Sequence, residues 1–363
     1  MNFNFISRVF CISVICLVFL ANFSLADNPE SGKSTGIGRV FFPNPVATLQ
    51  NQDLTDQKDE NYAALQPAYR FVSLTNLDGS GYLHGDWANV KSSTGPLAYS
   101  SDNTFSYNRK DDQFEQVMAY YWITEAQNYI QSLGFGNSRR PINKEAQDVR
   151  INQYGIDNSY FKDKKDLLRF GKGGVDDAED AEVILHEYGH AMMDSQVIPF
   201  GFGTSVEARS IGEGFADYWA VTVTDVIAPT PDPACVADWD SVSYTTVKPH
   251  CLRRIDRNLH YPQDINGLVH HDGQIWSRAL WDIRAGLGSE KADTIILEAH
   301  FDFSPDTTMP AAAQATVEAA ESLYGENEGT IVRNAFIDRG ILENPQSYQL
   351  RTWSISSIPV MRL

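Results

Sequence analysis

The sequence is poor in cysteine and in positive charge. Only four of its 363 residues are cysteine, and 29 lysines and arginines face 47 aspartates and glutamates, which gives a formal net charge of −18. Because such a chain repels phosphate backbones, no nucleic acid is expected among its partners. No Cys-x-x-Cys pair occurs, so a structural zinc site built on paired thiolates is not indicated either.

Long apolar runs are also missing. The run from Val9 to Phe23 is 15 residues long, short of the roughly 20 that span a bilayer, so no stable membrane insertion is expected. It follows Arg8 and leads to Ser24-Leu25-Ala26, a small-x-small pattern typical of a secretory signal peptide. We therefore expect a cleaved signal at residues 1–26 and a secreted or periplasmic protein.

The few cysteines divide between two regions. Cys11 and Cys16 lie in the predicted signal, so Cys235 and Cys251 are the two that remain. In an oxidising destination two remaining cysteines favour a disulfide bond. Two free thiols are the alternative.

Hydrophobic periodicity indicates an α+β fold. Residues 27–60 are polar with three glycines before the short apolar stretch Val40-Phe41-Phe42, which predicts an extended arm packed on a core. Residues 61–345 are expected to form one domain, and 346–363 a tail. Short strand patterns and one helix pattern at 112–133 precede residue 170, and helix patterns dominate afterwards. Further helices are predicted at 212–224, 273–285, 291–300, 310–324 and 329–339.

The most informative pattern is His186-Glu187-Tyr188-Gly189-His190. On a helix, residues four apart share a face, so both imidazoles can reach one metal ion while Glu187 points toward a metal-bound water. Asp176 with Glu179 three residues later predicts a capping box at the start of this helix, which should run to about residue 194. Chance also supplies such a pentapeptide, so the zinc interpretation requires a third ligand.

Glu213 is the predicted third ligand. It lies 23 positions after His190, and three protein ligands leave a fourth position open for water, as in catalytic zinc sites. Asp217, one turn further, can accept the free ring N–H of a zinc histidine, for which we expect His186. An exposed acidic face is the alternative, but glycines flank Glu213 and aromatic residues follow it, which argues against a solvated surface.

These segments resemble the thermolysin-like glutamate-zincin metallopeptidases, most closely the fungalysin family. The residues that carry the resemblance are Asp180-Ala181-Glu182-Val183-Ile184-Leu185 before the pentapeptide, Gly212-Glu213-Gly214-Phe215-x-Asp217, Val269 to Trp276 with Leu280-Trp281-Asp282, and Asn158-Ser159-Tyr160-Phe161. The clear resemblance covers residues 150–285. It implies a two-lobed zincin domain, with a mixed lobe to about residue 194, a helical lobe at 195–345 and the active-site helix between them.

The resemblance also implies a function. It predicts a secreted endopeptidase that holds one zinc ion and hydrolyses protein or peptide substrates, with Glu187 as general base. His270 would stabilise the oxyanion, and His271 is its immediate rival. The implied edge strand that binds the substrate backbone includes Asn158, Ser159 and Tyr160.

Several features depart from the family pattern. Residues 191–210 contain no tyrosine, whereas thermolysin places one there to help stabilise the oxyanion. Gly212 stands where thermolysin has an asparagine that supports a zinc histidine. The stretch between the predicted signal and the edge strand is also too short for the long inhibitory pro-domain typical of the family.

Two other functions remain open. A zinc aminopeptidase of the same clan shares the segment around Glu213, but it would need a shorter interval after His190 and a Gly-x-Met-Glu-Asn segment, which is missing here. A catalytically inactive secreted zinc-binding protein is the non-enzymatic alternative, although such a protein would have no physical need for Glu187. Calcium would suit the acidic composition, but no twelve-residue calcium loop is present.

Overall fold

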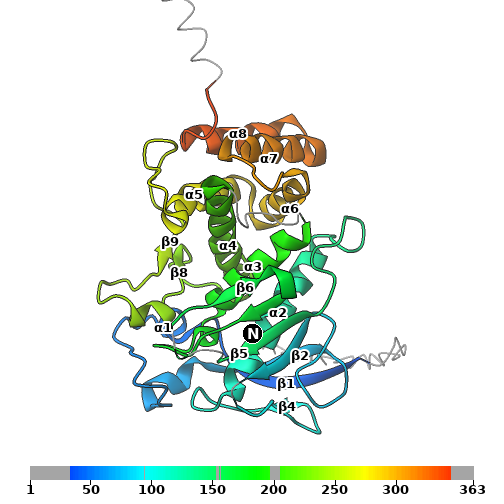
Figure 1. The fold of residues 1–363 in the computed structure, drawn as a ribbon, viewed down its shortest axis with the longest axis vertical. Helices are drawn as coiled ribbons and strands as arrows, with labels where there is room; N and C mark the ends of the chain where they lie inside the picture. Colours follow the sequence, from blue (N-terminus) through cyan, green and yellow to red (C-terminus); the bar gives the residue numbers. More distant parts are fainter. Residues whose placement is uncertain (1–32, 94, 153–154, 156, 197–204, 345–363) are drawn as a thin grey trace, which may run out of the picture. The chain divides into compact units, whose positions relative to one another are not determined.

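Small sheets followed by packed helices make up the described part of the chain (Figure 1). The structure is a computed structural model, and it describes residues 33–344 except 94, 153–154, 156 and 197–204. The predicted signal at 1–26 and the tail at 346–363 lie outside the described residues. The α+β fold class predicted from the sequence is confirmed. Among the described helices, none is both long and apolar enough to span a bilayer.

The first sheet has the strand order β2-β1-β4. Its middle strand, β1 (Ser34–Phe41), pairs antiparallel with β2 (Tyr69–Leu77) and parallel with β4 (Thr104–Phe105). The sequence predicts an extended arm packed on a core at 27–60, and the described part of this stretch lies against the main hydrophobic core. Val40 and Phe41 at the end of β1 are fully buried in this core. A short helix, α1 (Pro45–Leu49), and a 3₁₀ turn (Ala63–Ala68) connect β1 to β2.

The second sheet provides one wall of the candidate site. Its order is β3-β5-β7-β6, with β3 (Ala88–Ser93), β5 (Gln147–Ile151) and β7 (Leu167–Arg169) parallel to one another. The last strand, β6 (Tyr160–Lys162), runs antiparallel to β7 and lies at the edge of the sheet. This is the region where the sequence predicted an edge strand.

Helix α2 (Gln113–Ser132) is buried around most of its circumference and packs on the first two sheets. Helix α3 (Ala181–Gln196), which carries the pentapeptide, contacts α2, β6 and the next helix, α4 (Val206–Ile227). Figure 1 shows the sheets and the later helices on opposite sides of α3. The later helices are α5 (Val269–Leu287), α6 (Ser289–Ala299), α7 (Met309–Tyr324) and α8 (Glu326–Asp338).

The start of α3 differs from the sequence prediction. Asp176 makes no capping hydrogen bond, because residues 177–179 form a separate 3₁₀ turn and α3 begins only at Ala181. Asp180 takes the capping position instead, since its Oδ1 accepts from the Glu182 backbone N–H at 3.0 Å. The acidic run before α3 is therefore largely buried and is not a solvated helix start.

Helices α4 and α5 touch where both carry glycine. A Cβ built on Gly214 would lie 2.2 Å from the Gly273 carbonyl oxygen, so no larger residue fits there without displacing a backbone. This close approach brings Glu213 of α4 and His270 of α5 to the same place. The glycine beside the predicted ligand thus has a packing role.

Candidate active site

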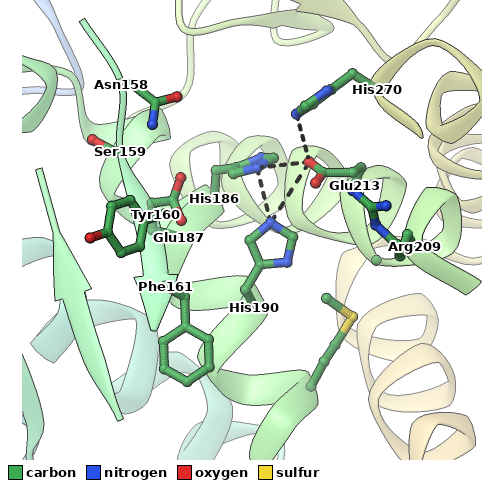
Figure 2. A pocket seen from close by; sticks show the side chains of 12 residues that line it. Asn158, Ser159, Tyr160, Phe161, His186, Glu187, His190, Arg209, Glu213 and His270 are labelled. Atoms are coloured by element: carbon green, nitrogen blue, oxygen red, sulfur yellow. Dashed lines mark hydrogen bonds and ion pairs between the residues drawn. The ribbon is translucent and has the colours of Figure 1, made fainter. Parts of the chain in front are cut away.

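Three side chains from α3 and α4 converge on one point (Figure 2). The Nε2 atoms of His186 and His190 lie 3.2 Å apart. From α4, Glu213 Oε2 approaches them at 3.3 and 3.7 Å respectively. The helical spacing of the histidines and the α3–α4 packing together produce this cluster.

The cluster has the dimensions of a zinc site. Two ligands bound to zinc at tetrahedral angles lie about 3.3 Å apart, since each metal–ligand bond is about 2.0–2.1 Å. All three ligand atoms lie within 4.8 Å of one another. Glu213 Oε2 is buried and has no hydrogen-bond partner among the described residues, although ring nitrogens surround it. Two imidazoles and an ionised carboxylate are also the donor set that zinc prefers, so the residues fit the ion.

Asp217 contacts the ring nitrogen of His186 that faces away from the cluster. Its Oδ1 lies 2.9 Å from His186 Nδ1, which leaves Nε2 directed at the cluster. Arg253 donates to the same carboxylate twice, at 2.6 and 2.7 Å. Burial alone would raise the pKa of Asp217, but Arg253 and His186 outweigh burial and lower it to about 2. Asp217 is therefore an ionised acceptor that fixes the ring orientation of His186.

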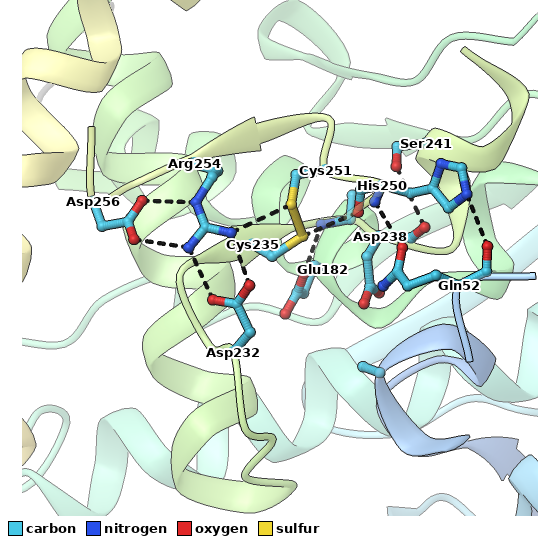
Figure 3. The surroundings of a disulfide bond; sticks show 12 residues. Gln52, Glu182, Asp232, Cys235, Asp238, Ser241, His250, Cys251, Arg254 and Asp256 are labelled. Carbon is cyan, nitrogen blue, oxygen red and sulfur yellow. Dashed lines mark hydrogen bonds and ion pairs between the residues drawn. A yellow bond between two sulfur atoms is a disulfide. The ribbon is translucent and has the colours of Figure 1, made fainter. Parts of the chain in front are cut away.

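Arg253 is a site residue that sequence reasoning missed. It lies in the two-residue strand β9 (Arg253–Arg254), which pairs with β8 (Cys235–Val236). The disulfide between Cys235 and Cys251 joins the same two segments and confirms the predicted pairing (Figure 3). The signal in the sequence was the arginine pair two residues after a cysteine.

The neighbouring Arg254 anchors this hairpin from the outside. It donates to both oxygens of Asp232 at 2.8 and 2.9 Å and to both oxygens of Asp256 at 2.8 and 2.7 Å (Figure 3). The disulfide and this ion-pair network hold β9 in place, so that Arg253 meets Asp217.

Glu187 lies beside the cluster and is nearly inaccessible, with 7 % of its surface exposed. Burial raises the pKa of Glu187, while the two site histidines and a hydrogen bond from the Phe161 backbone act in the opposite direction. A carboxylate whose proton affinity is increased by burial suits general-base chemistry.

A cavity of about 320 Å³ opens over the cluster. Asn158, Ser159, Tyr160 and Phe161 line one side of it, and His186, Glu187, His190, Glu213 and His270 line the other. Only Tyr160 and Phe161 of the predicted edge segment lie within β6, since Asn158 and Ser159 precede the strand. The predicted substrate-binding segment and the predicted metal ligands therefore share one cavity.

The two adjacent histidines of α5 face different groups. His270 Nε2 lies 3.3 Å from Glu213 Oε2, and its side chain is 60 % exposed. His271 Nδ1 lies 3.1 Å from Asp272 Oδ1, and His271 does not line the cavity. The structure thus brings His270, and not His271, to the cluster of His186, His190 and Glu213.

A positive side chain stands in the region that lacks the tyrosine. Arg209 lies on α4 one turn before Glu213 and lines the same cavity (Figure 2). The sequence analysis noted that a tyrosine is missing from this interval but did not predict a role for the arginine. Residues 197–204 of the interval lie outside the described residues.

The part of the chain that carries these residues is similar to a family of known proteins. Residues 167–344 match the Fungalysin metallopeptidase (M36) family. The matched segment contains the three converging side chains, Glu187 and His270, and it confirms the resemblance predicted from the sequence. The match supports a zinc metallopeptidase. No curated protein sequence matches the chain.

Solved structures show the same fold. The precursor of protealysin, a metalloproteinase from Serratia proteamaculans, superposes with a TM-score of 0.57 at 17 % sequence identity. The similarity covers 70 % of this chain and 87 % of that chain. At this level of identity the likeness concerns the fold, which is of the zincin type, and the two-lobed division stays a prediction.

Proposed function

We propose that the protein is a secreted zinc-dependent endopeptidase. The observation that carries the proposal is the convergence of His186 Nε2, His190 Nε2 and Glu213 Oε2 at zinc-ligand distances. Glu187 lies next to them in a cavity whose other side is the edge of a sheet. Such an arrangement supplies metal ligands, a base and a place for an extended peptide in one site.

Each residue has a proposed role. A zinc ion held by the three ligands supplies Lewis-acid polarisation of a carbonyl and a water of lowered pKa. Glu187 accepts the proton of the attacking water and passes it to the leaving amine. His270 and Arg209 face the same cavity, where donors can stabilise the developing oxyanion.

The edge strand supports cleavage within chains. An extended peptide can add to β6 as a further strand, because β6 has a neighbour on only one side in the sheet order. Backbone pairing of this kind does not require a free terminus, which favours an endopeptidase. The Cys235–Cys251 disulfide and the predicted signal favour export.

The test is Glu187→Gln assayed on casein and on peptides with a blocked amino terminus. We expect loss of cleavage by at least about 10²-fold, because the general base is removed, with one zinc per chain retained by metal analysis. Glu318→Gln, on the exposed face of α7, is the matched control and should cleave normally. Cleavage of casein by Glu187→Gln at the original rate would overturn the role of Glu187. Release of single residues only from unblocked peptides would indicate an aminopeptidase.

A further inference from the structure

A second cavity, of about 110 Å³, lies beside the candidate active site. His186, Glu187 and His270 line it as well as the first cavity. Arg253 and Asn158 are also among its lining residues. Because the same catalytic side chains border both spaces, whatever enters the second cavity must lie next to the reacting bond.

Part of the wall of this cavity is apolar. The residues that form it come from α3 and from the disulfide-linked hairpin and are Val183, Val236, Ala237 and Leu252. Aliphatic walls of this kind favour an aliphatic chain, since burying its methylenes contributes about 0.8 kcal/mol each.

Another part of the lining is acidic. Asp177 and Asp240 both face the cavity, and each is only 3 % exposed. The Oδ1 atom of each carboxylate is buried without a hydrogen-bond partner among the described residues. Carboxylate oxygens of Asp157, Asp177 and Asp240 lie within 4.8 Å of one another, although Asp157 does not line the cavity.

Among the lining residues Arg253 is the one lysine or arginine, and it makes no ion pair with these carboxylates. Within the described part of the chain, no lysine or arginine forms an ion pair with Asp177 or Asp240, and the nearby Arg253 is bound by Asp217. Burial raises the pKa of Asp240, the negative charges of Asp177 and Asp157 raise it further, and the positive charge of Arg253 opposes them without cancelling the shift. Uncompensated buried carboxylates are costly, so their presence at the cavity indicates a cationic ligand.

The shape of the cavity distinguishes between cations. Calcium requires six to eight oxygen ligands around it, whereas four of the fourteen lining residues are aliphatic and the ring nitrogens of His186 and His270 and the guanidinium of Arg253 also border the cavity. A lysine or arginine side chain has the matching pattern, with an apolar stem and a charged end.

We propose that this cavity binds the side chain of a lysine or arginine residue that adjoins the cleaved bond. The proposal rests on the proposed peptidase function and names its substrate class. The stem lies along Val183 and Leu252, and the cationic head meets Asp177 and Asp240. A neutral side chain would leave one buried oxygen of each carboxylate without a partner, so bonds flanked by apolar residues are poor substrates.

The first experiment maps cleavage sites in a proteome-derived peptide library by mass spectrometry. The zinc-loaded full chain should prefer lysine or arginine, at one constant side of the bond, over leucine or phenylalanine by at least about tenfold. Asp240→Asn keeps the side-chain shape and should reduce this preference at least tenfold. Asp238→Asn is the matched control, because Asp238 is a buried carboxylate of the same loop that does not line the cavity, and it should keep the preference. A preference for apolar residues, or one that Asp240→Asn leaves unchanged, would overturn the proposal.

A binding experiment separates this proposal from the proposed function. Zinc-loaded Glu187→Gln is titrated by calorimetry with a blocked tripeptide that carries lysine, and with its norleucine analogue, which has the same stem without the charge. Tighter binding of the lysine peptide that Asp240→Asn abolishes supports the pocket, even if the wild-type chain cleaves nothing. Equal binding of the two peptides, or calcium binding that Asp240→Asn removes and that displaces the lysine peptide, contradicts it.

Discussion

Two buried polar clusters meet beside Glu187 and differ in how their charges are compensated. In the paired cluster, defined as His186, Asp217 and Arg253, each oxygen of Asp217 receives at least one hydrogen bond. In the acidic pocket, defined as Asp177 and Asp240, one oxygen of each carboxylate has no hydrogen-bond partner among the described residues. Both clusters are almost fully buried, so exposure to water does not explain the difference.

Three carboxylates around the start of α3 are compensated by other groups of the protein. Glu179 binds the fully buried Arg109 at 2.9 Å. Asp180 caps α3 and accepts from the Trp239 backbone N–H at 3.1 Å. Glu182 accepts from Thr224 at 3.0 Å and from the Ala237 backbone N–H at 2.6 Å. Asp176, Asp238 and Glu115 also have buried oxygens without a hydrogen-bond partner among the described residues, but only Asp177 and Asp240 of this group line the cavity beside Glu187, where a ligand can reach them.

The largest expected effect comes from breaking the paired cluster with Arg253→Met. Because this change leaves Asp217 as a buried carboxylate without its arginine, we expect the free energy of unfolding to fall by about 3–5 kcal/mol. The matched control is Arg254→Met on the same strand, whose partners are partly exposed and which should cost about 0–1 kcal/mol. Denaturant unfolding of the metal-free proteins measures both. Equal losses for the two variants would contradict the comparison.

A smaller effect is expected from Asp217→Asn. The amide cannot hold His186 as an ionised carboxylate does, so zinc affinity should fall by about 10- to 100-fold. Competition with a chelator measures the affinity directly. Asp225→Asn, on the same helix but paired with Arg284, should leave zinc affinity unchanged. Unaltered zinc binding by Asp217→Asn would show that the paired cluster does not support the metal ligands.

The smallest effect is a pH dependence of stability that arises in the acidic pocket. Burial raises the pKa of Asp177 from 3.8 to about 7, with Ser159 opposing the shift and Asp157 adding to it. The folded state therefore holds a proton that the unfolded state has released. This contribution to the free energy of unfolding is fully present below pH 3.8 and is lost as the pH rises through about 7.

Asp177→Asn removes this titration. Thermal unfolding between pH 5.5 and 8 should show that the variant gains stability relative to the wild type as the pH rises. A difference between the two proteins that does not change with pH would mean that Asp177 is already compensated in the folded state.

Local spacing was enough to find the core of the candidate site. His186 and His190 face one point because residues four apart share a helix face, and this depends only on residues 181–196 forming a helix. The later helix patterns also correspond to α4–α8, with ends that differ by a few residues. Such features depend on neighbours in sequence, which a single chain displays directly.

Features that depend on distant partners were not predicted. The sequence predicted an arm packed on a core at 27–60, but not that β1 pairs with both β2 and β4, because both partner strands lie further along the chain. The predicted capping box at Asp176 does not form. The carboxylate of Glu179 instead accepts a hydrogen bond from Arg109, which lies 70 residues away in the sequence. Arg253 was missed because its partner Asp217 lies 36 positions earlier.

By itself the sequence determined the ligand types, their helical spacing and the disulfide-forming cysteines. Only the tertiary structure decided that His270 and not His271 reaches Glu213, because the glycine contact between α4 and α5 sets which face of α5 meets the cluster. It alone also brought Asp177 and Asp240, 63 positions apart in the sequence, into one uncompensated pocket. Charge compensation depends on distances through space, and those are set only when the helices and the hairpin pack together.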